Sequence, residues 1–458
     1  MNPTAPFERT LARDLGVSHA GAIVVGTIIG SGIFLVPQEM MQAVGSAPLV
    51  YLAWIVGGLL SFFGVLTYAE LSALKPQAGG EYVYVRDGYG PLAGFLYAWT
   101  WCFIAKPASI ASITTALVRI LGTFPVFGFL SHTISNQSQI TWGQIFAVLA
   151  TLLITLLNYL GVKKAGDFQL VFTLLKIAMI LVIVAVGFSY SHGSLAHFQE
   201  TFTGAKGGAS GFMTALVAAL WAYDGWNDLT MVSGEVKDPE RNLPLALIFG
   251  VATVALLYLS VNAAIQYVMP AAAIAASPRP ASDAVSLVIG PAGAALVAAG
   301  TALSMLVTLN GTILSGARVP FAVARDGYFF QALGNVHPRF RTPSVALVVQ
   351  AGLAVILLLL GGSFRQFFSL AIFAEWLFYM IAASTIFIFR RDKGTQSTYR
   401  TWGYPVVPIL FILGSACVLR STFIDNLPYS AWGTLLILAG IPVFYVFSSL
   451  RARQSNSR

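Results

Sequence analysis

Charge is scarce in this sequence. Asp, Glu, Lys and Arg make up only 10% of its 458 residues, whereas soluble domains carry about 25%. So few charged side chains cannot cover the surface of a water-soluble globule of this size, which excludes a soluble enzyme and a nucleic-acid-binding domain. The formal net charge of +8 therefore does not indicate a nucleic acid partner.

Cysteines and metal-ligand patterns are scarce as well. Cys102 and Cys417 are the only cysteines, and both lie in apolar segments without a CxxC spacing. This pattern excludes a secreted disulfide scaffold. The five histidines form no HExxH or similar spacing. We therefore expect no metal, no cofactor and no catalytic residues.

Apolar residues are abundant instead, at 57% of the chain. Because a membrane-spanning helix needs about 20 of them in a row, the apolar runs predict an all-α integral membrane protein with twelve transmembrane helices. The predicted spans lie near residues 17–43, 48–74, 91–122, 141–161, 167–189, 208–236, 244–269, 291–324, 343–362, 366–390, 404–424 and 430–450. We expect residues 1–458 to form a single transmembrane domain with short loops.

Lys and Arg predict the orientation of these spans. An even number of spans places both termini on one side, and we place that side in the cytoplasm. Nineteen of the 26 Lys and Arg residues then fall in cytoplasmic loops or tails, four fall outside and three lie within spans. Such a bias is typical of membrane proteins. It accounts for the net charge and predicts that residues 1–16 form a cytoplasmic tail.

Two of the spans contain residues that interrupt a membrane helix. The first reads GAIVVGTIIGSGIFLVPQ, with Gly26, Gly30 and Gly32 near its middle, and the sixth reads ALVAALWAYDGWNDLTMVSGE, with Asp224 near its middle. Unwound backbone at this depth is tolerated only where it lines a cavity. It frees N–H groups, which suit a carboxylate, and C=O groups, which suit an ammonium. An amino acid has both.

The glycines of the first span have a second interpretation. The spacing Gly26-xxx-Gly30 is also typical of close helix packing in membranes. The break in the sixth span favours binding, because interrupted helices five spans apart are expected in two inverted repeats. We therefore expect a first five-helix repeat over 17–189, a second over 208–390, and two last helices over 404–450.

Three stretches carry a resemblance to a known family: GTIIGSGIF (26–34), AGGEYVYVRDGYGPLAGFLYAW (78–99) and WAYDGWNDLTMVSGEVKDPERNLPLA (221–246). They are similar to the amino acid–polyamine–organocation (APC) superfamily, and within it to the L-type amino acid transporter (LAT) family. The resemblance covers nearly the whole chain. It implies a LeuT-type fold with broken helices 1 and 6, and amino acid transport without sodium, usually by exchange.

The resemblance also implies a set of substrate-binding residues from the two interrupted spans. They are Thr27, Ile28, Gly30, Ser31, Gly32, Trp221, Asp224 and Asn227. In the family, the GSG stretch binds the substrate carboxylate, and nearby backbone carbonyls meet the ammonium. Trp221 is implied to close over the substrate from outside, and Asn227 to shape the side-chain pocket. Lys176 lies where sodium-coupled relatives hold an ion.

Three of these residues have plainer interpretations. Trp221 also suits ordinary packing. Asp224 is an ionisable group within the membrane, where function is usual, but Asp is also a good N-cap for the second half of a broken helix. Lys176 has a stem that can reach the interface, although it lies about ten residues into its span, too deep for easy escape.

Charged residues near the cytoplasmic face suggest an inner gate. Glu81 and Glu235 belong to the family-like stretches, and we expect them either to be solvated or to pair with Arg318 or Arg86. Glu375, within the tenth span, has no partner that the sequence suggests.

The sequence predicts the class of substrate, an amino acid, and leaves two alternatives for the charge of its side chain. Many neutral-amino-acid carriers have a small residue where this chain has Asp224, and Asp228 is a further acid. We expect small or medium neutral L-amino acids as the main cargo. The alternative is a cationic or broad-specificity antiporter or permease, with or without coupling to protons.

Other functions and partners fit less well. A membrane-bound enzyme lacks a convergent set of Ser, His and Asp, and a transporter-fold sensor is expected to carry a soluble output domain. Animal members of the family pair with a single-span glycoprotein through a cysteine in the loop between spans three and four. That loop, 123–140, has no cysteine, so we expect no disulfide-linked heavy subunit. The expected partners are the amino acid and the lipid bilayer of the plasma membrane.

Overall fold

The computed structural model is an all-helical bundle over the residues that it describes, which are 10–135, 139–361, 364–392, 397–425 and 427–456. Within these ranges only isolated β-bridges occur, with no strand. The α-helices are α1 (Val17–Ile28), α2 (Gly32–Val44), α3 (Ala47–Leu74), α4 (Glu81–Tyr89), α5 (Pro91–Thr100), α6 (Lys106–Leu121), α7 (Trp142–Tyr159), α8 (Val162–Phe188), α9 (Gly208–Ala222), α10 (Asp228–Met231), α11 (Pro239–Val268), α12 (Ala271–Ala276), α13 (Pro280–Ile289), α14 (Pro291–Gly316), α15 (Arg318–Arg325), α16 (Ser344–Leu360), α17 (Phe364–Phe389), α18 (Val406–Asp425) and α19 (Leu427–Asn456). The shorter turns are η1 (Trp101–Ala105), η2 (Pro125–Ser131), η3 (Leu195–Phe198), η4 (Ser233–Glu235) and η5 (Gln331–Gly334).

A helix lies in each of the twelve predicted ranges, while the number of membrane crossings stays a prediction. Among the described residues, nine helices are long and apolar enough to cross a membrane. The shorter apolar helices are Gly208–Ala222, Pro280–Ile289, Ser344–Leu360 and Ala374–Phe389. The protein is therefore all-helical and rich in membrane-spanning helices.

The sixth range is interrupted, as predicted, and the structure adds short helices that the prediction lacked. The helix of the sixth range ends at Ala222, and only α10 and η4 follow before the segment ends. The predicted loops also contain α4, α12 and α13, which are too short to stand out as apolar runs. Glycine and proline set one of these boundaries, because α13 ends at Gly290 (φ 74°) and α14 begins at Pro291.

The first predicted span lies at the centre of the bundle. α1 packs between α8, α11 and α14. In the most apolar window of Val17–Val44, 83% of the residues are buried inside the protein, against 22% in Ser430–Arg451. The interrupted helix is thus enclosed by protein, and α19 forms part of the outer surface.

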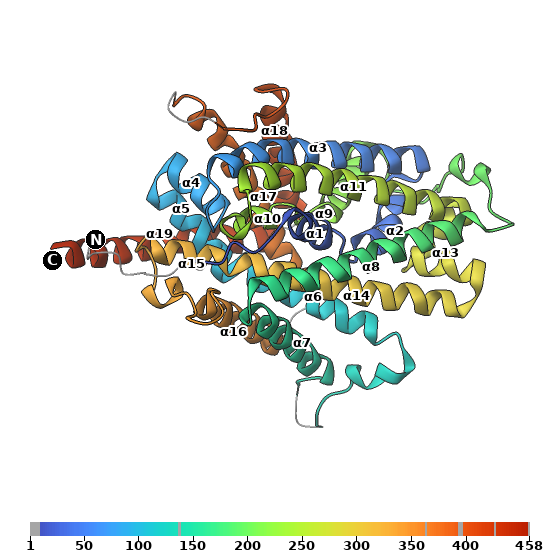
Figure 1. The fold of residues 1–458 in the computed structure, drawn as a ribbon. Coiled ribbons are helices and arrows are strands. Elements are labelled where there is room, and N and C mark those ends of the chain that lie inside the picture. Colours follow the sequence, from blue (N-terminus) through green and yellow to red (C-terminus); the bar gives the residue numbers. More distant parts are fainter. Residues whose placement is uncertain (1–9, 136–138, 362–363, 393–396, 426, 457–458) are drawn as a thin grey trace.

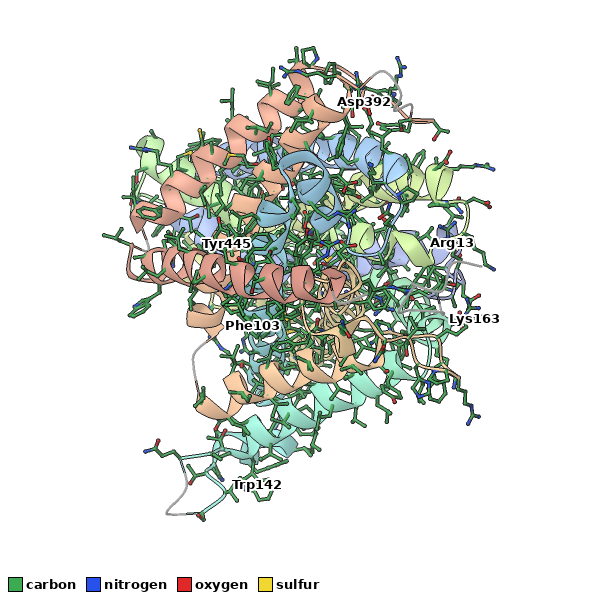
Figure 2. All side chains as sticks on the ribbon, turned by 90° about the vertical axis from the view of Figure 1, so that its left-hand side faces the viewer. Arg13, Phe103, Trp142, Lys163, Asp392 and Tyr445 are labelled. Carbon is green, nitrogen blue, oxygen red and sulfur yellow. The ribbon has the colours of Figure 1, made fainter. Side chains whose placement is uncertain are left out.

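The outer flank of the bundle is apolar. Phe103, Trp142 and Tyr445, labelled in Figure 2, come from different helices and have 36%, 43% and 60% of their surface exposed. Aromatic residues exposed in this way are unfavourable in water and typical of a surface that faces lipid. The flank therefore agrees with a multi-pass membrane protein.

The two ends of the described chain lie at the same end of the bundle, beside α4 and α15 (Figure 1). The Arg451 guanidinium of α19 lies 4.5 Å from the centroid of the Tyr328 ring. Figure 2 looks onto this end, where Arg13 and Lys163 are labelled. Three basic residues predicted for this side lie outside the described residues: Arg9, Lys393 and Arg458.

Candidate functional site

The first predicted helix break is present. α1 ends at Ile28 and α2 begins at Gly32, and the intervening Ile29 has a non-helical ψ of 88°. Carbonyl oxygens at the end of α1 and N–H groups at the start of α2 therefore lose their helical partners. The break exposes backbone groups of both polarities in the centre of the protein.

Side chains from two other helices hold the carbonyls freed at the end of α1. The Lys176 Nζ of α8 lies 2.8 Å from the Gly26 carbonyl oxygen and 2.6 Å from that of Ile29. From α14, the Ser304 hydroxyl donates to Ile29 (2.7 Å), and Thr308 lies 3.2 Å from the Gly26 oxygen. Lys176 is fully buried, so it does not reach the interface, and it joins α8 to the broken helix.

The second predicted break faces the first. α9 ends at Ala222 and α10 begins at Asp228. Gly225, between them, has φ of 107°, and an added Cβ there would lie 3.2 Å from the carbonyl carbon of Thr27. A Cβ added to Gly32 would lie 3.2 Å from the Ala222 Cα. Glycine is therefore required where the two breaks meet.

A tyrosine from α11 bridges the two breaks. The Tyr258 hydroxyl lies 3.1 Å from the Ile28 carbonyl oxygen and 2.8 Å from that of Ala222. Because one hydroxyl donates only one proton, it holds one carbonyl at a time or shares the bond. The sequence contains no signal for this contact.

A cavity that is partly open to solvent lies between the breaks. All eight residues predicted to bind substrate line it, which are Thr27, Ile28, Gly30, Ser31, Gly32, Trp221, Asp224 and Asn227. Its other lining residues are Lys106, Ser109, Ser112, Ile113, Ala222, Gly225, Asp228, Met305, Thr308, Thr312, Glu375 and Tyr379. Lys176 is not among them; it contacts the carbonyl oxygens of Gly26 and Ile29.

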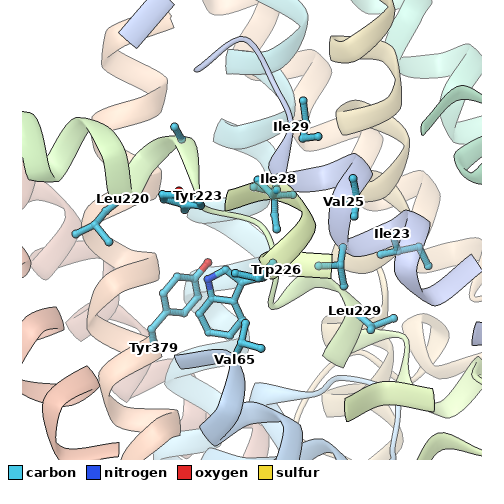
Figure 3. Packing of buried hydrophobic residues seen from close by; sticks show 14 of the residues in the cluster. Ile23, Val25, Ile28, Ile29, Val65, Leu220, Tyr223, Trp226, Leu229 and Tyr379 are labelled. Atoms are coloured by element: carbon cyan, nitrogen blue, oxygen red, sulfur yellow. The ribbon is translucent and has the colours of Figure 1, made fainter. Parts of the chain in front are cut away.

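Asp224 is bound by a tyrosine of α17. The Tyr379 hydroxyl lies 2.9 Å from Oδ1 of Asp224 and 3.0 Å from Oδ1 of Asn227. Figure 3 shows the Tyr379 ring beside Trp226, and the two ring centroids are 5.5 Å apart. The residue at the N-cap of α10 is Asn227, which makes no side-chain cap. The N-cap interpretation of Asp224 is therefore wrong.

A buried ion pair lies in the cavity wall. Nζ of Lys106 is 2.5 Å from Oδ1 of Asp228, and the two side chains are 6% and 2% exposed. Lys106 follows a π-helical turn, in which its N–H donates to the Trp101 carbonyl. Pro107 comes next, and because proline has no N–H it disfavours a regular α-helical turn. A Lys-Pro pair inside an apolar span is the signal by which the sequence could have revealed this site.

Glu375, for which the sequence suggests no partner, also faces the cavity. It is 4% exposed, and the Ser109 hydroxyl of α6 lies 3.4 Å from its Oε1. The cavity thus carries two carboxyl groups, those of Asp224 and Glu375, outside the Lys106–Asp228 pair. Within the described ranges, no group of three or more His, Cys, Asp or Glu is placed to hold a metal ion.

One of the predicted gate pairs is present. Nε and Nη2 of Arg318 lie 2.6 and 3.1 Å from the two carboxylate oxygens of Glu235, and both side chains are fully buried. Leu15, from the segment before α1, donates its N–H to the Glu235 carbonyl (3.0 Å). The pair links η4 to α15 inside the bundle.

The predicted pairing of Glu81 with an arginine is wrong. Arg86 forms ion pairs with Asp87 and Asp326 instead. Glu81 points the other way, into the bundle, where its Oε2 accepts hydrogen bonds from Tyr97 (2.6 Å) and Asn227 (3.3 Å). The sequence did not reveal this because α4 was expected to be a loop.

Comparison with known proteins gives a consistent picture. Residues 15–448 match the family described as amino acid permease. The chain is 34% identical to the serine/threonine exchanger SteT of Bacillus subtilis (strain 168), over 96% of this chain and 98% of that protein. It is 29% identical to the b(0,+)-type amino acid transporter 1 of Rattus norvegicus, over 99% and 91%. It is also 29% identical to the cystine/glutamate transporter of Homo sapiens, over 95% and 85%.

Proposed function

This chain belongs to the amino acid permease family of the APC superfamily, among the L-type amino acid transporters, and we propose that it exchanges amino acids across the plasma membrane without sodium. The cavity between the two helix breaks carries this proposal. It joins backbone groups of both polarities to the eight residues expected to bind substrate. Alternating access to such a central site is how transporters with interrupted helices move substrate.

The proposed architecture has twelve crossings in a LeuT-type fold. The two inverted repeats cover 17–189 and 208–390, the last two helices cover 404–450, and both termini lie in the cytoplasm. The support is that the breaks at 29–31 and 223–227 fall in the first and sixth predicted spans. The described basic residues Arg13 and Lys163 also lie at the end where the chain begins and ends.

The proposed mode of binding uses the polarity of the first break. The substrate carboxylate lies at Gly30, Ser31 and Gly32, where α2 begins, because a helix N-terminus offers N–H groups and a positive dipole end. The substrate ammonium lies at the carbonyl end of α1, beside Thr27 and Ile28. Trp221, at the end of α9 on the cavity wall, closes over the bound amino acid.

Independence from sodium rests on Lys176. Its ammonium lies 2.8 and 2.6 Å from the carbonyl oxygens of Gly26 and Ile29. Carbonyl oxygens are the ligands that a hard cation uses, and here the Lys176 amine already occupies two of them. Lys176 therefore takes the role of the ion, and it holds the broken helix in shape.

The main cargo is proposed to be small or medium neutral L-amino acids. Support comes from the Lys106–Asp228 pair, which neutralises its own charges within the cavity wall. A second candidate is a cationic or broad-specificity antiporter. Asp224 and Glu375, the two carboxyl groups outside the pair, favour this alternative, since a cationic side chain is compensated there.

No disulfide-linked heavy subunit is proposed. Cys102 is buried in η1, and Cys417 lies within α18. The loop 123–140 contains no cysteine in the sequence. Residues 136–138 of this loop lie outside the described residues.

Uptake by liposomes that contain the purified protein tests the proposal. Labelled L-serine uptake would be competed with alanine, threonine, leucine, arginine, lysine and aspartate, each in excess. Competition by alanine and threonine supports the neutral exchanger. Strong competition by arginine alone reverses the ranking in favour of the cationic candidate, and the absence of uptake for every amino acid offered contradicts the function.

A further inference from the structure

Glu81 is a buried carboxyl group with an incomplete set of hydrogen bonds. It is fully buried at the first residue of α4, between the spans that end at Leu74 and begin at Pro91. Its Oε2 accepts from Tyr97 and Asn227, but in the described part of the chain its Oε1 has no hydrogen-bond partner. Burying an ionised carboxylate costs free energy when one of its oxygens has no hydrogen-bond partner. Burying a neutral carboxylic acid in the same place costs much less.

The groups around Glu81 allow its carboxyl group to hold a proton. They are Tyr68 of α3, Tyr84 of α4, Tyr97 of α5, Lys106 of α6 and Tyr379 of α17. The positively charged one, Lys106, is already paired with Asp228 at 2.5 Å. The Tyr68 hydroxyl lies 3.2 Å from the Tyr379 carbonyl oxygen and also faces Glu81, so its one proton is shared between the two. Burial raises the pKa of Glu81 to about 7, although hydrogen bonds from Tyr97, Tyr68 and Asn227 and the charge of Lys106 act to lower it.

One side chain separates Glu81 from the cavity. Asn227 lines the cavity, donates its amide to Glu81 (3.3 Å) and accepts at its oxygen from Tyr379 (3.0 Å). The same Tyr379 hydroxyl binds Asp224. A change in the protonation of Glu81 therefore acts directly on a hydrogen-bond network that contacts the substrate site.

The turn directly before α4, formed by Gly79 and Gly80, packs closely on α10. Gly79 donates its N–H to the Met231 carbonyl (2.9 Å). Gly80 has φ of 46°, and an added Cβ there would lie 2.7 Å from the carbonyl carbon of Thr230. This backbone contact lies next to Glu81 in the chain, so separation of α10 from the Gly79–Gly80 turn would open a path for water toward the carboxyl group.

We propose that Glu81 is a proton-binding site of this transporter, protonated while the Gly79–Gly80 turn packs against α10 and deprotonated when the two separate. Exchange then slows as Glu81 loses its proton, because the packed conformation belongs to the cycle. The inference uses the proposed amino acid exchange as one readout and does not depend on which amino acid is carried.

The first test is the pH profile of labelled L-serine exchange in liposomes, from about pH 5.5 to about pH 8.5. The wild-type rate falls by about tenfold or more over this range, because a carboxyl group with a pKa near 7 loses most of its protons there. Glu81→Gln, a neutral mimic of the protonated acid, gives a flat profile. Glu240→Gln, which changes an exposed carboxylate at the start of α11, keeps the wild-type profile.

A second variant tests the same idea without removing the carboxyl group. Tyr97→Phe deletes the 2.6 Å hydrogen bond that lowers the pKa of Glu81, so the midpoint of the profile moves to higher pH. Parallel profiles for the wild type and Glu81→Gln, or an unchanged midpoint in Tyr97→Phe, would overturn the proposal.

A measurement without substrate separates this proposal from the exchange function. The native pKa of Glu81 lies above its ordinary value of 4.5, so the native state binds the proton more tightly than the unfolded state. The stabilisation is present at low pH and is lost as pH rises through about 7. The Tm of the detergent-purified wild type therefore falls relative to Glu81→Gln between about pH 5.5 and about pH 8.5. A constant Tm difference contradicts the proton site, whereas a lack of exchange at every pH contradicts only the proposed function.

Discussion

At the scale of single residues, the site is organised by polar groups that replace lost backbone partners. Lys176 is the clearest case, because an ammonium with two carbonyl oxygens at 2.8 and 2.6 Å is buried where α1 ends. A buried charge of this kind is tolerated only with such partners. The sequence predicted its location, since a lysine about ten residues into an apolar span lies too deep to reach water and must find its partners within the protein.

Lys176→Ala is expected to lower the initial rate of uptake by about tenfold while the protein still folds. The variant leaves the carbonyls of Gly26 and Ile29 with fewer donors, which costs about 1–3 kcal/mol. Uptake and Tm would be measured together. Lys163→Ala, at an exposed position of the same helix, is the matched control, and unchanged kinetics in Lys176→Ala would return the lysine to a merely structural role.

Trp221→Ala is expected to slow transport by about tenfold or more and to weaken serine binding much less. Closure over the substrate is a step in turnover, so loss of a gate acts on the rate. Binding to the detergent-purified protein and uptake in liposomes would be compared. Trp432→Ala, on the exposed surface of α19, serves as the control, and a parallel loss of binding and transport would make Trp221 an ordinary contact.

Asp224→Asn is expected to weaken competition by arginine by about tenfold and to change serine uptake less. The variant keeps the size and the hydrogen bond with Tyr379 (2.9 Å), but it removes a charge that compensates a cationic side chain. Glu375→Gln tests the second carboxyl group in the same assay. Equal inhibition by arginine in the wild type and in both variants would remove the cationic candidate.

At the scale of elements, the two helix breaks were predictable and their mutual contacts were not. A glycine cluster and an acidic residue in apolar spans indicate unwound backbone, because glycine and carboxylates are costly in a membrane helix. The contact between Lys106 and Asp228 joins residues 122 positions apart. Such a pair depends on the packing of α6 against the second break, which no local pattern encodes. The same holds for Tyr258, one of three aromatic residues in the apolar helix α11.

The short helices between the spans were missed for a related reason. α4 has nine residues and lacks a long apolar run, so its residues resembled a polar loop. Its buried face is created by contact with α17 and α15. That contact directs Glu81 into the bundle and Arg86 toward Asp326, so these two residues do not pair in a gate.

Gly225→Ala is expected to destabilise the protein by about 1–3 kcal/mol and to abolish uptake. Its φ of 107° is unfavourable for alanine, and the added Cβ would meet Thr27 at 3.2 Å. Gly352→Ala is the control, since it lies in α16 with nothing within 4 Å of the added Cβ. The measurement is the Tm of each variant, compared with that of the wild type. An unchanged Tm in Gly225→Ala would mean that the two breaks are not in tight contact.

At the scale of the whole molecule, a central cavity is enclosed by helices whose outer face is apolar. The buried Glu235–Arg318 pair joins η4 to α15, and α15 lies at the end of the bundle that also holds the described ends of the chain. Composition alone predicted the membrane environment, because 10% charged residues cannot solvate a soluble fold. Hydropathy alone does not determine the number of crossings, since enclosed helices such as α9 are shorter than a bilayer requires.

The central claim is that this cavity exchanges amino acids without sodium. The most direct test is labelled L-serine uptake into liposomes that contain the protein, loaded with unlabelled L-serine or left empty, with sodium replaced by choline on both sides. We predict rapid uptake only with internal serine and no change when sodium is replaced. Uptake that requires sodium and ignores internal serine would contradict the account.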